Sequence, residues 1–140
     1  MMKKLIIILI FALTSGCGSS GSDTNSSTTS SIVGTWSFIY PSSGCEESYA
    51  FNSNGTWSAS ALDEIQTGTY TFDETVNAGE RHALSIAVTS DNGLPDCEGI
   101  SSDATGVSGT VYASFRNNNA TMEWYLNLTG GTPDLILSKK

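Results

Sequence analysis

The side chains able to do chemistry are few in this chain of 140 residues. His82 is the only histidine, and it stands in "GERHAL" at the expected start of a strand, where a structural role is favoured. The many serines occur without the Gly-x-Ser-x-Gly pattern that exposes a hydrolase nucleophile, and there is no phosphate-binding loop. The sequence therefore predicts no catalytic residue and a protein that is not an enzyme.

Four carboxylates could in principle bind a metal. Asp91, Asp96, Glu98 and Asp103 gather in one Gly/Ser-rich stretch, and calcium takes oxygen ligands of this kind. Their spacing misses the EF-hand pattern, which favours a solvated acidic loop. A single histidine and three cysteines make a zinc site improbable. We therefore expect no metal and no cofactor.

The charge balance restricts the partners. The net charge is −8, with six basic and fourteen acidic residues, and Lys3 and Lys4 are two of the six. Little positive charge is left to neutralise phosphates, so nucleic acid is an unexpected partner. Electrostatic docking on anionic lipid is disfavoured for the same reason.

The N-terminus carries the most specific motif. "MMKK" is followed by "LIIILIFAL" at 5–13, an apolar run too short to span a bilayer but typical of a secretory signal. The next residues, "LTSGC", resemble the lipobox of bacterial lipoproteins, although Thr14 stands where that motif commonly has Leu. The resemblance implies a signal peptide over 1–16 and a mature chain that begins at Cys17.

The same resemblance implies a lipid anchor. The Cys17 thiol would carry a diacylglyceryl group and its amino group a further acyl chain such as palmitate, and two or three chains give stable membrane attachment. Gly18 stands where Asp commonly retains such lipoproteins in the inner membrane. The expected location is therefore the outer membrane, on either its periplasmic or its surface face.

Residues 17–31 form the expected link to the folded part. "GSSGSDTNSSTTSS" at 18–31 has no aliphatic or aromatic side chain, so it cannot bury enough surface to offset its ordering entropy. As a flexible coil, these fourteen residues have a mean reach of roughly 20 Å. They would let a domain reorient clear of the lipid headgroups.

From Ile32 onward, apolar and polar residues alternate as in half-buried strands. Turn signals separate the alternating segments, above all Asn54-Gly55 and the run of Asn at 117–119. The pattern predicts an all-β fold of eight short strands over 32–140. A closed up-and-down antiparallel barrel is favoured, and a β-sandwich is the alternative.

Two short motifs add a family resemblance. Gly34-Thr35-Trp36 opens the first expected strand, and the expected hairpin that follows contains "FNSNGTW" at 51–57. Lipocalins carry a Gly-x-Trp on the first strand, and this layout resembles that of bacterial lipocalin-like lipoproteins. Lipocalins also place an Arg late in the fold against that Trp, whereas this chain ends in Lys139-Lys140.

With Cys17 assigned to the lipid anchor, Cys45 and Cys97 remain. An exported protein with an even remainder of cysteines favours a disulfide between them. Such a bridge would attach the long 91–108 loop to one end of the barrel and stabilise the fold by about 4 kcal/mol in the chain-entropy model. A redox-active pair is less favoured, because the two do not form a CxxC motif.

The expected inward-facing aromatic side chains leave two interpretations open. They either fill the barrel as a core or line a small apolar pocket, since barrels of eight strands do both. The resemblance favours a module that binds a small hydrophobic ligand. The alternative is a structural or protein-interaction lipoprotein with a filled barrel and no ligand, which presents its outer face or a loop end to another envelope protein. The candidate lining residues are Trp36, Phe38, Tyr49, Phe51, Trp57, Tyr70, Phe72, Phe115 and Trp124.

Overall fold

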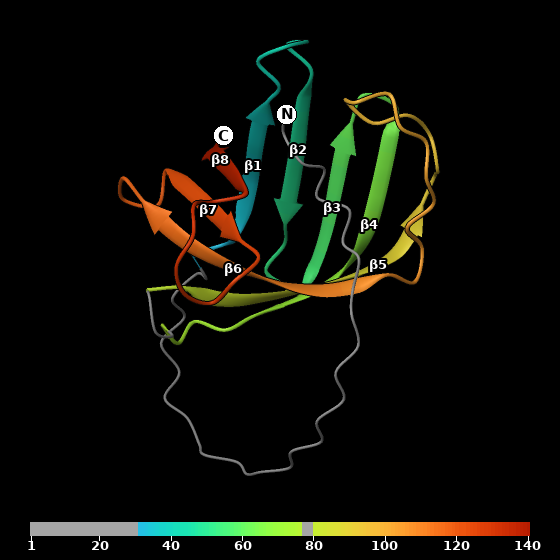
Figure 1. The fold of residues 1–140 in the computed structure, drawn as a ribbon. Coiled ribbons are helices and arrows are strands. Elements are labelled where there is room, and N and C mark those ends of the chain that lie inside the picture. The colour runs from blue at the N-terminus through green and yellow to red at the C-terminus, as the bar shows by residue number, and fades with distance from the viewer. Residues whose placement is uncertain (1–30, 77–79) are drawn as a thin grey trace.

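Eight antiparallel strands close into one barrel (Figure 1). The structure is a computed structural model, and it describes residues 31–76 and 80–140. Each strand pairs with the next along the chain, and the last pairs with the first, so the barrel is confirmed and the sandwich is not formed. The strands are β1 (Gly34–Ile39), β2 (Glu46–Phe51), β3 (Thr56–Ala61), β4 (Glu64–Phe72), β5 (His82–Asp91), β6 (Ser108–Arg116), β7 (Thr121–Tyr125) and β8 (Leu135–Lys139).

The predicted turns lie where their residues allow a left-handed backbone. Gly55 has a φ of 80°, and the side chain of Asn54 accepts hydrogen bonds from the backbone and hydroxyl of Thr56. The three asparagines at 117–119 all have positive φ and connect β6 to β7. Asparagine tolerates this region because its short amide can bond to the local backbone.

Gly68 allows two strands to approach closely where the barrel bends. The register between β4 and β5 shifts between Thr67 and Gly68. A Cβ atom at Gly68 would lie 1.9 Å from the Ala87 carbonyl oxygen and 2.7 Å from Nε1 of Trp57. That indole nitrogen donates a hydrogen bond of 3.2 Å to the same carbonyl. The bulge and the glycine together let the sheet curve onto the Trp57 side chain.

A short seam between β1 and β8 closes the barrel. Trp36 pairs with Lys139 and Ser37 with Ser138, and the Lys140 amide donates to the Thr35 carbonyl at 2.9 Å. In Figure 1 the C-terminus therefore lies beside β1. A closed sheet leaves no unpaired edge strand for another chain to extend.

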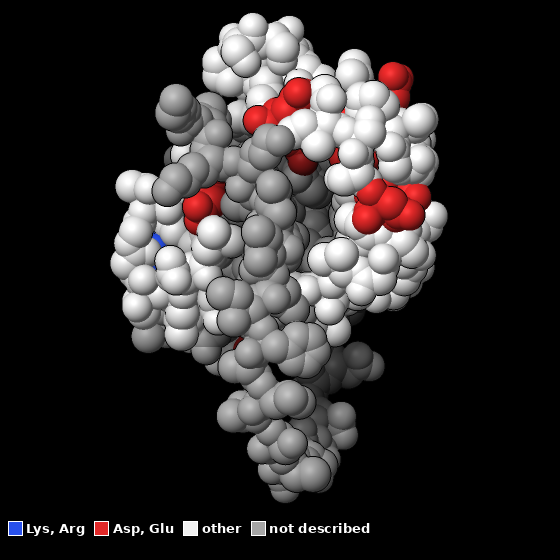
Figure 2. Space-filling model, turned by 45° about the vertical axis from the view of Figure 1, so that its right-hand side comes forward, with Lys and Arg blue, Asp and Glu red and all other residues white. Residues whose placement is uncertain are grey.

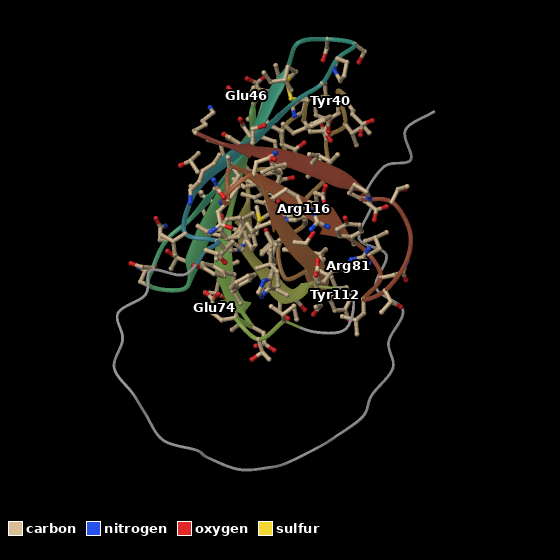
Figure 3. All side chains as sticks on the ribbon, turned by 90° about the vertical axis from the view of Figure 1, so that its left-hand side faces the viewer. Tyr40, Glu46, Glu74, Arg81, Tyr112 and Arg116 are labelled. Atoms are coloured by element: carbon tan, nitrogen blue, oxygen red, sulfur yellow. A yellow bond between two sulfur atoms is a disulfide. The ribbon has the colours of Figure 1, made fainter. Side chains whose placement is uncertain are left out.

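The two ends of the barrel differ in their connections. One end, which we call the disulfide end, has the loops 40–45, 62–63, 92–107 and 126–134. The other, the terminal end, has the loops 52–55, 73–81 and 117–120, the start of β1 and the end of β8. Figure 3 shows Tyr40 and Glu46 towards the first end and Glu74 towards the second.

The predicted disulfide is present. Cys45 and Cys97 are bonded with an S–S distance of 1.98 Å, and their Cα–Cα distance of 5.6 Å is usual for a bridge. The bond joins the loop between β1 and β2 to the loop between β5 and β6. It therefore fixes the longest loop against the barrel, as the sequence indicated.

Replacing Gly68 with Ala should destabilise the barrel by about 2 kcal/mol or more, because the new methyl group would overlap the Ala87 carbonyl. Urea denaturation followed by tryptophan fluorescence measures the loss. Thr67→Ala, which changes an exposed side chain on the same strand, is the control and should stay within about 0.5 kcal/mol of the parent. Equal stability of the two variants would contradict the role assigned to Gly68.

Candidate functional site at the disulfide end

All nine predicted lining residues belong to one hydrophobic cluster inside the barrel. Four are buried in it, and five are partly buried and packed against it. The buried ones are Trp36, Phe51, Trp57 and Trp124; the partly buried ones are Phe38, Tyr49, Tyr70, Phe72 and Phe115. The structure thus brings the whole set together.

Their rings meet across the barrel interior. Trp124 on β7 contacts Tyr49 on β2 with 4.9 Å between ring centroids, and Trp36 on β1 lies 5.7 Å from Phe115 on β6. The first pair is edge-to-face and the second is tilted, and ring pairs at such distances pack favourably. Two hollows of about 450 Å³ lie among the described residues, and both are open to solvent. Neither is an enclosed chamber of the kind that surrounds a small apolar ligand.

Trp36 forms the floor of the interior. Its Nε1 donates a hydrogen bond of 2.8 Å to the carbonyl of Ile32, and both residues are fully buried. Nζ of Lys139 lies 5.0 Å from the centre of the indole ring. A cation from the last strand therefore packs on the first-strand Trp, the place that lipocalins give to an Arg. A cation–π contact of this kind contributes about 0.5–1 kcal/mol at an exposed site.

Above the aromatic cluster, the interior becomes polar. Glu47 has the same strand parity as Tyr49 and Phe51, so it too points inward. Its carboxylate accepts hydrogen bonds from the hydroxyls of Tyr40, at 2.9 Å, and Tyr49. Burial, followed by the negative charge of Glu47, raises the pKa of both phenols. They remain neutral donors to this carboxylate at neutral pH.

A second inward group lies on β4 and β5. The amide of Gln66 donates to Glu64 at 3.1 Å and to Asp91 at 2.9 Å. Asp91 also accepts from the backbone amides of Gly93, at 2.8 Å, and Ala104, at 2.9 Å, so it ties the long loop to the barrel. Partial burial and then the charge of Asp91 raise the pKa of the Glu64 carboxyl.

The other residues singled out for chemistry have structural contacts. His82 packs on Phe72 and Phe115, at 5.2 and 5.8 Å between ring centroids, and its Nδ1 lies 3.1 Å from the Asp73 carbonyl oxygen. Asp96 accepts from two amides of its own loop. Among residues 31–76 and 80–140, no group of three or more His, Cys, Asp or Glu is placed to hold a metal ion.

Among the exposed apolar side chains at this end, three come from the β3–β4 hairpin and the long loop, and the sequence analysis did not single them out. Leu62, Ile65 and Leu94 are 63%, 56% and 48% exposed. The hairpin "ALDEI" carried the available signal, because an aliphatic residue in a two-residue turn is unusual. Similarly, parity with Tyr49 and Tyr70 could have placed Glu47 and Glu64 inside the barrel.

Comparison with known proteins gives no match, whether to a family model, a curated protein or a solved structure. No helix of the described residues is long and apolar enough to cross a membrane. Cys17, the signal segment 1–16 and nearly all of the link at 17–31 lie outside the described residues. Support for a lipocalin-like barrel comes from the closed eight-stranded up-and-down topology.

Replacing Glu64 with Gln should stabilise the protein at pH 7 by up to about 1 kcal/mol, since water screens much of the repulsion. The pKa of Glu64 is raised, so the native state holds this proton more tightly than the unfolded state does. The stability that this group contributes is fully present below its unfolded pKa and falls as the pH rises through its folded pKa. Urea titrations at pH 7 and pH 4 should show the advantage of Glu64→Gln shrinking in acid.

Glu46→Gln provides a control of opposite sign. The hydrogen bond from Lys140 lowers the pKa of Glu46, so this variant should lose stability at pH 7 and approach the parent in acid. The same pH response in both variants would contradict the electrostatic difference between these two carboxylates.

Proposed function

We propose that this protein is a lipid-anchored lipoprotein of the bacterial cell envelope, without enzymatic activity, whose filled barrel acts as a protein-interaction module. One observation carries the proposal of a filled barrel: aromatic rings from β2 and β7 contact each other in the barrel interior. These ring contacts support a core packed with side chains over a chamber for a hydrophobic ligand. Binding must then use the outer surface or a loop end.

The arrangement of the chain supports an outward-facing barrel. β1 starts at the terminal end, so a lipid anchor on Cys17 would connect to that end through the expected link at 17–31. The disulfide end then points away from the membrane. A reach of roughly 20 Å gives the barrel freedom to meet partners in the envelope.

Hydrogen bonding supports a non-enzymatic role. Glu47 accepts two and Asp91 three hydrogen bonds that hold the barrel or its long loop. A general acid or base needs a partner in the substrate, whereas these carboxylates are engaged by the fold. Disulfide formation agrees with an oxidising compartment outside the cytoplasm.

Replacing Cys17 with Ser should move the protein from the membrane to the soluble fraction, because the acyl chains would have no thiol to attach to. Fractionation of the host cells, with mass spectrometry of the N-terminus, measures the change. Ser15→Ala, which keeps a small residue two positions before Cys17, should remain membrane-bound and serves as the control. A Cys17→Ser protein that stays in the membrane fraction and is processed like the parent would overturn the proposed anchor.

A small-ligand role is the second candidate, favoured by one observation. Nε1 of Trp124 is buried and has no hydrogen-bond acceptor, although a buried indole N–H usually finds one. A ligand or a water molecule could supply the acceptor.

Native mass spectrometry of protein extracted from its own membrane separates the two candidates. If the barrel is filled, the measured mass should equal that of the lipidated chain alone. A stoichiometric small molecule that is lost in Trp124→Phe would establish the ligand role and refute the filled barrel.

A further inference from the structure

Three exposed leucine and isoleucine side chains at the disulfide end come from two segments that lie side by side. We call Leu62, Ile65 and Leu94 the apolar patch. Backbone hydrogen bonds hold its two segments together: the amides of Asp63 and Glu64 both donate to the Pro95 carbonyl at 3.2 Å. Asn92 completes the connection, with its side chain accepting from the amides of Ile65, at 3.1 Å, and Leu94, at 3.2 Å.

The backbone at Leu62 points to a role beyond folding. Leu62 is the first of the two residues between β3 and β4, and its φ is 56°. A hairpin of this length with positive φ at its first central residue favours glycine. A bulky aliphatic residue in the left-handed region is strained, and strain of this kind is concentrated at binding and switch sites. Here the strained residue is also one of the most exposed large apolar side chains.

Carboxylates surround the apolar patch. Asp63 and Glu64 adjoin it in the β3–β4 turn, and Asp96 follows Pro95 in the long loop. The four loops of the disulfide end contain Asp63, Asp96, Glu98, Asp103 and Asp134 but no Lys or Arg. In Figure 2 the right-hand side of Figure 1 is turned towards the viewer. This face shows several groups of Asp and Glu and only a trace of Lys or Arg.

The cystine lies in the same structural unit. Cys97 is two residues after Pro95, and its bond to Cys45 fixes the segment that carries Leu94. The patch is therefore presented on a covalently restrained surface. Preorganisation of this kind lowers the conformational entropy lost on binding.

We propose that the apolar patch and its carboxylates bind a basic, apolar segment of another envelope protein. Leucine and isoleucine side chains would be buried by apolar residues of the partner, and lysines or arginines would pair with Asp63 and Asp96. This inference rests on the proposed function, since it assigns the interaction surface of that module.

Charge separates this partner from two others. An anionic lipid surface would be repelled by the carboxylates, and a lipid anchor at the far end would turn the patch away from it. A second copy of this chain docking through the same patch would bring like charges together, which is costly at an interface. Both remain measurable outcomes of the test.

The test uses full-chain protein in nanodiscs of neutral phosphatidylcholine, with empty nanodiscs as the blank. The probes are three labelled peptides of twelve residues. The first alternates Lys with Leu, the second Lys with Ser, and the third Glu with Leu. The Lys/Leu peptide should bind most tightly, and its Kd should rise between 50 and 200 mM NaCl by about threefold or more. Equal binding of the Lys/Leu and Glu/Leu peptides would overturn the proposal.

Matched variants locate the binding. The triple change of Leu62, Ile65 and Leu94 to Ser should raise the Kd for the Lys/Leu peptide by about tenfold. Changing Ile39, Leu126 and Ile136 to Ser, three side chains of similar exposure that lie outside the apolar patch on the β7–β8–β1 side of the barrel, should leave it within about twofold. Equal effects of the two triple variants would refute the assignment.

Leu62→Asn separates binding from folding. Asparagine tolerates positive φ, so the urea midpoint should stay equal or rise, while the Kd for the Lys/Leu peptide should increase about threefold or more. A fall in stability with unchanged affinity would mean that Leu62 serves the fold and would overturn its role here.

Two further measurements cover the other partners. Binding of the disulfide end to phosphatidylglycerol vesicles, or self-association in sedimentation that the patch triple variant abolishes, would overturn the proposal in favour of lipid or a second copy. The proposed function has separate tests: Cys17→Ser reports on the anchor and native mass spectrometry on the filled interior, and neither depends on the peptides.

Discussion

Closure of β1 against β8 around Trp36 is the constraint on which the rest of the structure depends. The seam has only two register pairs, Trp36 with Lys139 and Ser37 with Ser138. Trp36 supports it from inside, through its bond to the Ile32 carbonyl and the contact with Lys139. Without closure, both β1 and β8 would be free edges, and the ring contacts that span the interior would lose their opposite wall.

Closure also sorts the interior into two zones. Near the floor, Trp36 and Phe115 pack in an apolar environment. Towards the disulfide end, Glu47 and Glu64 point into the same interior and are held by tyrosine hydroxyls and a glutamine amide. The inward carboxylates are therefore concentrated at one end, while the other end has the seam, the start of β1 and the end of β8.

The sequence was sufficient to predict the strands, the closed barrel, the cystine and the inward aromatics, because each depends on a local signal. Alternation identifies an inward face, and Asn54-Gly55 specifies a hairpin. The contact of Lys139 with Trp36 and the proximity of Leu94 to Leu62 were not predicted, because they depend on which segments become neighbours in space. Lys139 reaches Trp36 only because β8 pairs with β1, and Leu94 lies by Leu62 only through bonds to Asn92 and Pro95.

The distribution of carboxylates is hard to explain by stability or solubility alone. A net negative charge keeps a protein soluble wherever its acidic residues lie. Here several of them converge on one end, where partial burial and then the charge of Asp91 raise the pKa of Glu64. The disulfide offsets such a cost by restricting the unfolded chain. A surface that is electrostatically unfavourable, covalently restrained and apolar at its centre is what recognition of a cationic partner requires, since that partner relieves the repulsion when it binds.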